Sequence, residues 1–172
     1  QEFLKPIEKM HEGCPKYIGL DLAVSLKTKA NKSSFVVGQV TPSNVLQIID
    51  NEVDRLDSLD IVNTILDLQT KYDPEFFVVE KGPIWSAIDP LLIKVSVERG
   101  IYPNIKTYPA TQDKLARART IQGRMRMGAV QFLKDASWYA RMESELLRFP
   151  KGASDDIVDS LAWLGIALAQ MT

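Results

Sequence analysis

The sequence predicts an α/β domain on a mixed five-stranded sheet: three antiparallel strands, then alternating helices and strands, with helices on both faces. Three observations carry this prediction. Strand-length apolar segments follow one another between residues 16 and 53, separated by turn-forming residues. Apolar residues then recur at helical spacing. The run FFVV at 76–79 is wholly apolar, which is typical of a strand covered on both faces.

The first three strands are expected at KYIGLDLAVS, SFVVGQVT and NVLQIIDNEV. The polar, basic segment SLKTKANKSS predicts a hairpin loop between the first two strands, and TPSN at 41–44 predicts a turn before the third. A helix follows and ends at Asp73-Pro74. The later elements are expected as strand FFVVE, a helix over 84–99, strand IKTYPA, a basic helix over 111–127, a short extended segment AVQFL, and helices over 137–148 and about 154–170.

The composition excludes several classes of protein. With 172 residues, 45% of them hydrophobic, the chain can bury one core, so a single domain over 16–172 is expected after a leader or linker at 1–15. One cysteine and one histidine, Cys14 and His11, are too few for a structural zinc site, which needs about four ligands. No apolar run approaches the roughly 18 residues of a membrane span, so no membrane partner is expected.

Carboxylates occur where apolar residues dominate. Asp21 lies inside the apolar segment YIGLDLAV, and Glu80 ends the buried strand FFVVE. A charged residue in such a strand is rare unless it is paired or binds a metal. Ligands of open α/β sheets bind beyond the carboxyl ends of the strands. Taken singly, Asp21 could pair with a lysine and Glu80 could simply mark the end of its strand.

Three more carboxylates, Asp155, Asp156 and Asp159, open the apolar C-terminal helix. Acidic residues at a helix N-terminus often serve only as caps, because the helix dipole favours anions there. Asp159 lies one turn further into an apolar helix, where capping does not explain it. Together with Asp21 and Glu80, the cluster predicts a pair of Mg²⁺ or Mn²⁺ ions, since both metals prefer oxygen ligands. Two ions about 3.5–4 Å apart would activate water for phosphodiester cleavage.

Positive charge is concentrated in one segment although the formal net charge is −1. Eight basic residues stand against two acidic ones between 94 and 126, which favours a phosphate-binding face or, alternatively, a solvated helix. Lys81, beside Glu80, is expected either to orient a phosphate or water or to offset the acids. The predicted DNA-binding residues are Lys27, Lys29, Lys32, Lys81, Lys114, Arg117, Arg119, Arg124 and Arg126. The three tryptophans, Trp85, Trp138 and Trp163, are expected in the core rather than as base-stacking platforms.

In the positions of these acids the chain resembles the RNase H-like (RuvC-like) nuclease superfamily, which has acids in the first strand, at the end of the fourth strand and at the start of the last helix. Within it, most of residues 17–165 resemble the nuclease domain of the large terminase subunit of tailed bacteriophages. The stretches that carry this resemblance are YIGLDLAVS, FFVVEKG, TYPATQDKLARARTIQGRMRMGAVQF and ELLRFPKGASDDIVDSLAWLG.

The resemblance implies a metal-dependent endonuclease that cuts double-stranded viral DNA concatemers during genome packaging, with little sequence specificity. Asp21, Glu80 and Asp156 would be the metal-binding acids, with Asp155 and Asp159 as close helpers whose roles stay open. The family joins this nuclease to a packaging ATPase, and no Walker motif occurs here, so residues 1–15 would include the junction to a missing N-terminal domain. The implied partners are the portal and the small terminase subunit, in the cytoplasm of an infected bacterium.

Three other functions stay open. A junction resolvase or transposase-type nuclease would share the fold but select branched DNA. A non-catalytic module docking a motor on DNA or the portal would bind without metal-dependent cleavage. A sugar-kinase-like phosphotransferase has related topology and an early strand aspartate, but Asp21-Leu22-Ala23 lacks the glycine expected there.

Overall fold

The computed structural model describes residues 5–23, 32–110, 114–149 and 156–171, and it confirms the predicted α/β class. The strands are β1 (Lys5–Ile7), β2 (Lys16–Asp21), β3 (Ser33–Val40), β4 (Leu46–Asp54), β5 (Phe76–Lys81), β6 (Ile105–Pro109) and β7 (Val130–Leu133). The helices are α1 (Ser58–Tyr72), α2 (Pro83–Arg99), α3 (Lys114–Arg126), α4 (Tyr139–Arg148) and α5 (Asp156–Ala169). No helix within these ranges is long and apolar enough to cross a membrane.

The sheet has seven strands in the order β1-β7-β4-β3-β2-β5-β6, not the five expected. The antiparallel meander β2-β3-β4 is confirmed, and β5 and β6 add in parallel beside β2. The extra strands are β7, the extended segment expected at AVQFL, and β1, from the segment predicted to be a leader. Strands this short do not show by hydrophobic periodicity that they join the sheet, because their pairing depends on partners far away in the chain.

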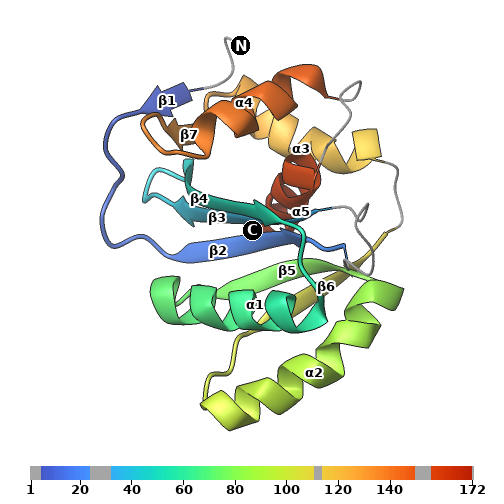
Figure 1. The fold of residues 1–172 in the computed structure, drawn as a ribbon. Helices are drawn as coiled ribbons and strands as arrows, with labels where there is room; N and C mark the ends of the chain where they lie inside the picture. Colours follow the sequence, from blue (N-terminus) through green and yellow to red (C-terminus); the bar gives the residue numbers. More distant parts are fainter. Residues whose placement is uncertain (1–4, 24–31, 111–113, 150–155, 172) are drawn as a thin grey trace.

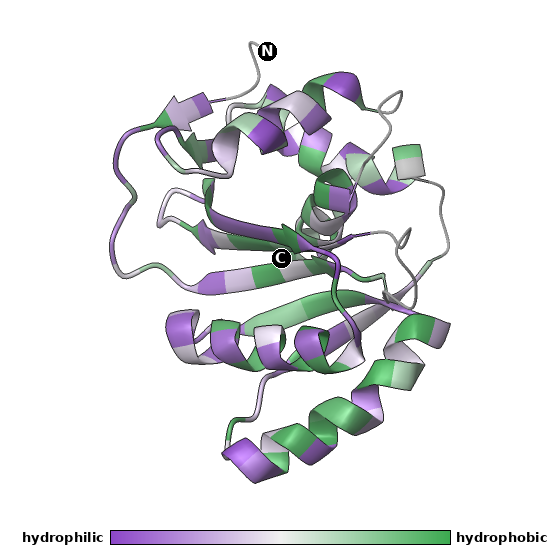
Figure 2. Ribbon diagram, viewed as in Figure 1, coloured by the Kyte–Doolittle hydropathy of each residue, from purple (hydrophilic) through white to green (hydrophobic). Residues whose placement is uncertain are grey.

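Helices cover both faces of the sheet (Figure 1). Helices α1 and α2 pack on one face over a core that includes Ile18, Leu20 and Phe77. Helices α3, α4 and α5 lie on the other, over a core that includes Tyr17 and Val78. Purple and green alternate along α1 in Figure 2, as expected for a helix with one buried side, whereas α5 is buried almost all round.

Close packing fixes α5 against β2. A Cβ added at Gly19 would lie 2.2 Å from the backbone oxygen of Ser160 and 3.1 Å from Cβ of Leu164. Leu164 also lies over Gly38, which pairs with Tyr17 two residues back along β2. Helix α5 therefore runs beside β2 with its N-terminus toward the Asp21 end of the strand.

Candidate active site

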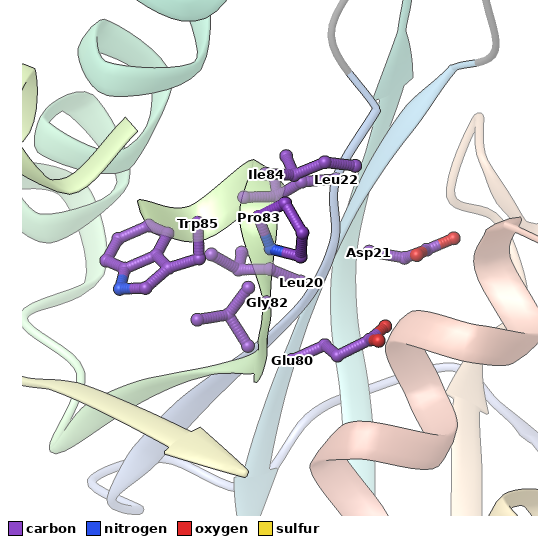
Figure 3. Close-up of a pocket in the computed structure, with 9 residues that line it drawn as sticks. Leu20, Asp21, Leu22, Glu80, Gly82, Pro83, Ile84 and Trp85 are labelled. Carbon is purple, nitrogen blue, oxygen red and sulfur yellow. The ribbon is translucent and has the colours of Figure 1, made fainter. Parts of the chain in front are cut away.

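Asp21 and Glu80 end two adjacent parallel strands. The last residues paired between β2 and β5 are Gly19 and Val78, each two positions earlier, so the two acids lie level with one another. Side chains alternate along a strand, so Asp21 shares a face with Gly19 and Glu80 with Val78, which is the α5 face. Figure 3 shows both carboxylates directed the same way, toward the faint red α5 and away from Trp85. Both residues are partly exposed and line one pocket of about 80 Å³.

Asp156 and Asp159 are three residues apart and lie on neighbouring sides of α5. Residues 156, 160 and 164 share one face at i, i+4 spacing, and Ser160 and Leu164 of this set contact β2 at Gly19. Asp156 therefore lies one turn nearer the Asp21 end, on the side that faces the strand acids. Asp159 is buried, with a relative exposure of 6%, on the side that faces α3. Asp155 lies outside the described residues.

A buried polar cluster holds α5 to the sheet beside Asp21. The hydroxyls of Ser34 and Ser160 are 2.8 Å apart, and Ser34 is the residue paired with Asp21 across β2 and β3. The amide nitrogen of the Asn51 side chain donates to Ser34 Oγ at 3.2 Å. Because both serines are fully buried, this cluster fixes the distance between the strand and the first turns of the helix.

Arg117 is placed differently from the sequence expectation. It was predicted to contact DNA, but its side chain is only 13% exposed, and its Nη2 lies 3.8 Å from Oδ1 of Asp159. Its guanidinium carbon lies 5.5 Å from the centre of the Trp163 ring. A buried charge needs a partner, so Arg117 offsets the charge of Asp159 inside the protein. Asp159, one of the three predicted helix acids, thus has a basic side chain beside one of its carboxylate oxygens, and its predicted metal role stays a prediction.

Glu145 was missed by the sequence reasoning. Its Oε1 accepts hydrogen bonds from the backbone amides of Ile157 at 2.7 Å and Val158 at 3.3 Å. Burial raises the pKa of its carboxyl, the two amides oppose that rise, and nearby Asp156 adds to it. The signal was present: Glu145 lies three residues after the buried Met142, so α4 carries a carboxylate on its apolar side.

The remaining basic residues fall into distinct groups. Arg119 and Arg126 are exposed and seven residues apart on α3, hence on the same side of the helix. Arg124 instead binds the turn before β4, through the backbone and side-chain oxygens of Asn44 at 3.2 and 3.1 Å, and burial lowers its pKa. In this arrangement Arg124 stabilises the turn before β4, and its predicted contact with DNA stays a prediction.

Lys81 is exposed and, by strand alternation, belongs to the face opposite Glu80, so it does not point at the acids. Lys32, just before β3, is half-buried. Lys27, Lys29 and the side chain of Lys114 lie outside the described residues. Trp85 and Trp163 are buried and Trp138 packs against the core, as predicted.

The donors fit a hard divalent cation held partly by substrate. Across the described part of the chain, no three His, Cys, Asp or Glu residues are grouped closely enough to hold a metal by themselves. Mg²⁺ is usually bound by one or two carboxylates, with waters and phosphate oxygens completing the shell, rather than by an all-protein cage. Asp21 and Glu80, level on adjacent strands, supply such a pair, and Asp156 lies on the facing side of α5.

Together the element order and the sheet define an RNase H-like α/β fold. The structure is similar to that of the large terminase nuclease from thermophilic phage G20c with bound cobalt, with a TM-score of 0.71 and 19% identity over 96% of this chain and 93% of that one. It also matches the large terminase of another thermophilic bacteriophage, with a TM-score of 0.67 and 11% identity over 98% of this chain and 44% of that one.

A third similar structure is the yeast mitochondrial Holliday junction resolvase Ydc2, with a TM-score of 0.55 and 14% identity over 94% of this chain and 79% of that one. No protein-family model and no curated protein sequence matches the chain. The predicted RNase H-like fold, and the structural likeness to terminase nucleases, are confirmed. At these identities the likeness establishes the fold, and function has to be argued from the site.

Proposed function

We propose that this chain is a metal-dependent endonuclease that cuts double-stranded DNA during bacteriophage genome packaging. The observation that supports the proposal is the pair of carboxylates, Asp21 and Glu80, level at the ends of adjacent parallel strands and directed toward α5. The packing at Gly19 places Asp156 of α5 toward the same strands. The nuclease fold shared with the G20c terminase, whose structures hold zinc, cobalt or magnesium, supports it.

Each group has a role in this proposal. Asp21, Glu80 and Asp156 would hold Mg²⁺ or Mn²⁺, two ions when DNA is bound, with Asp155 as a further candidate ligand. When bound, such ions activate a water and stabilise the leaving oxygen of the phosphodiester. The exposed arginines of α3 would bind the backbone phosphates, which carry no base information, so little sequence specificity is expected. Arg117 keeps Asp159 in place inside the protein.

The biological setting is part of the same proposal. The chain spans 44% of the large terminase structure that it matches. In this proposal an N-terminal packaging ATPase belongs to the same polypeptide and is joined through residues 1–15. The portal and the small terminase subunit would be its partners, and the host cytoplasm its location. Strand β1 pairs with β7, so at least residues 5–7 of that junction would belong to the nuclease sheet.

The direct test is cleavage of supercoiled plasmid by the purified chain with Mg²⁺, with Mn²⁺ and with EDTA. Nicked and linear products are expected with either metal and none with EDTA. Cleavage that persists in EDTA would contradict the metal site. If neither metal supports cleavage but the chain still binds DNA, the docking-module alternative would be favoured.

A junction resolvase is the second candidate, because the fold also matches Ydc2. Linear duplex and a four-way junction of equal length separate the two functions. The packaging nuclease should cut both at similar rates, whereas a resolvase should cut the junction at symmetric positions and leave the linear duplex intact.

Replacing Arg119 and Arg126 together by alanine should weaken DNA binding at low salt. Each phosphate contact contributes a slope of about −0.9 in log K against log salt, so the slope should fall by about 1–2. Binding is measured by fluorescence anisotropy between about 50 and 300 mM salt, where this dependence is steep. The matched control is Lys94→Ala/Arg99→Ala, which removes the same charge from α2 and should leave the slope unchanged. Equal slopes for both double variants would exclude this side of α3 from the DNA path.

A further inference from the structure

We propose that Glu145 is a positioning residue for the metal site: its carboxylate fixes the first turn of α5 and thereby the placement of Asp156. The inference rests on the proposed function, because it concerns the same acids. Glu145 itself is on none of the elements that carry the proposed metal ligands. It lies on α4 and accepts hydrogen bonds from the backbone of α5.

The hydrogen bonds are local to the proposed metal ligand. Ile157 and Val158, whose amides bind Glu145 Oε1 at 2.7 and 3.3 Å, directly follow Asp156. The first amides of a helix have no partner within the helix, so when buried they must find an acceptor elsewhere. Here both depend on one oxygen of a side chain from another helix, and Glu145 is itself only 8% exposed. The start of α5 is therefore set by α4.

The same turn is held from the opposite side by the sheet. Ser160 Oγ lies 2.8 Å from Ser34 Oγ of β3 and also bonds back to the carbonyl of Asp156 at 3.0 Å. Asp156 thus begins a turn clamped between α4 and β3. Groups that hydrogen-bond around a metal ligand in this way orient it, and their loss typically weakens metal affinity about 10–100-fold.

A carboxylate beside the proposed metal ligands has two possible effects, and the reach of the side chain distinguishes them. Glu145 could add negative charge near the cations, or it could hold the helix in place. Gln keeps the reach and an acceptor oxygen but loses the charge. Asp keeps the charge but withdraws the carboxylate by about one bond length, roughly 1.5 Å, which breaks contacts now at 2.7 and 3.3 Å.

The experiment measures Mn²⁺ affinity by calorimetry for Glu145→Ala, Glu145→Asp and Glu145→Gln, each shown to be folded by circular dichroism. Positioning predicts Mn²⁺ binding weakened about 10–100-fold in Glu145→Ala and Glu145→Asp and close to wild type in Glu145→Gln. Amide hydrogen exchange at Ile157 and Val158 should be faster in the first two variants alone. If Glu145→Ala does not fold, the Asp and Gln variants carry the comparison.

Asp57→Ala is the matched control. Asp57 caps α1 by accepting from the amide of Asp60 at 2.8 Å, on the other face of the sheet, so its loss removes a helix cap without touching α5. It should lower stability and leave Mn²⁺ affinity unchanged. Weakened binding in Glu145→Gln with normal binding in Glu145→Asp would overturn positioning in favour of charge, and wild-type affinity in all three variants would overturn the inference alone. Because substrate phosphates would complete the metal shell, the titration is run with and without duplex DNA; a wild-type chain that binds no Mn²⁺ in either case would overturn the proposed metal site, and this inference with it.

Discussion

Asp21→Asn is expected to abolish DNA cleavage while leaving the fold intact. The substitution keeps the size of the side chain and removes one carboxylate from the pair at the ends of β2 and β5. Metal ions in such sites contribute several kcal/mol of transition-state stabilisation, and each 1.36 kcal/mol is about a factor of ten in rate. The cleavage rate should therefore fall by about 10³-fold or more. Plasmid cleavage in Mg²⁺ and in Mn²⁺ measures it.

The same variant carries a second expectation that concerns stability. Without metal, Asp21 adds to the negative charge shared with Glu80 and Asp156, so its neutralisation should leave the melting temperature in EDTA unchanged or higher. The matched control is Asp67→Asn, since Asp67 lies on α1 and pairs with Arg99 at 3.0 Å on the far face of the sheet. That variant should cut DNA at the wild-type rate. Undiminished cleavage by folded Asp21→Asn would remove Asp21 from the metal site.

The strand acids could be predicted from the sequence because the signal is local. A carboxylate inside YIGLDLAV or at the end of FFVVE is unexpected among the apolar residues of a buried strand. The order of the elements then predicts that the two strand ends lie side by side, as they do. The core of the sheet was predictable for the same reason. Strand β1 was not predicted, and β7 was predicted only as an extended segment outside the sheet, because the pairing of three- and four-residue strands depends on partners distant in the chain.

The partners of the helix acids were hidden because they come from tertiary packing. Three carboxylates in five positions do require compensation, and the metal expectation followed from that requirement. The sequence does not show that α3 packs against α5, so it does not show that Arg117 reaches Asp159 and Trp163. Likewise helical spacing groups Asp156 with Asp159, and nearly so Asp155 with Asp159, but it does not show which side of the helix meets the sheet; the packing of Ser160 and Leu164 at Gly19 places Asp156 toward the strands.

Among the described glycines, this packing makes Gly19→Ala the alanine substitution with the largest expected loss of stability. Its Cβ would lie 2.2 Å from the backbone oxygen of Ser160, and backbone cannot rotate out of the way as a flexible side chain can. Either α5 moves off β2 or the strand deforms. Overpacking of this kind costs about 1–3 kcal/mol, and a backbone clash places the expected loss of unfolding free energy at the upper end, about 3 kcal/mol. Urea denaturation measures it.

Alanine substitutions at two other glycines provide a comparison for the expected loss of stability. At Gly38 an added Cβ would meet side-chain carbons of Leu46 at 2.8 Å and Leu164 at 3.0 Å, which can shift, so Gly38→Ala should destabilise less. Gly123, inside α3, has nothing within 4 Å, and Ala is favoured there by about 1 kcal/mol, so Gly123→Ala should stabilise the protein. Because α5 carries Asp156, the Gly19→Ala molecules that stay folded should also bind Mn²⁺ more weakly than wild type. The Gly38→Ala and Gly123→Ala variants should not show this loss of Mn²⁺ affinity. Wild-type stability in Gly19→Ala would contradict the contact between α5 and β2 on which the placement of Asp156 depends.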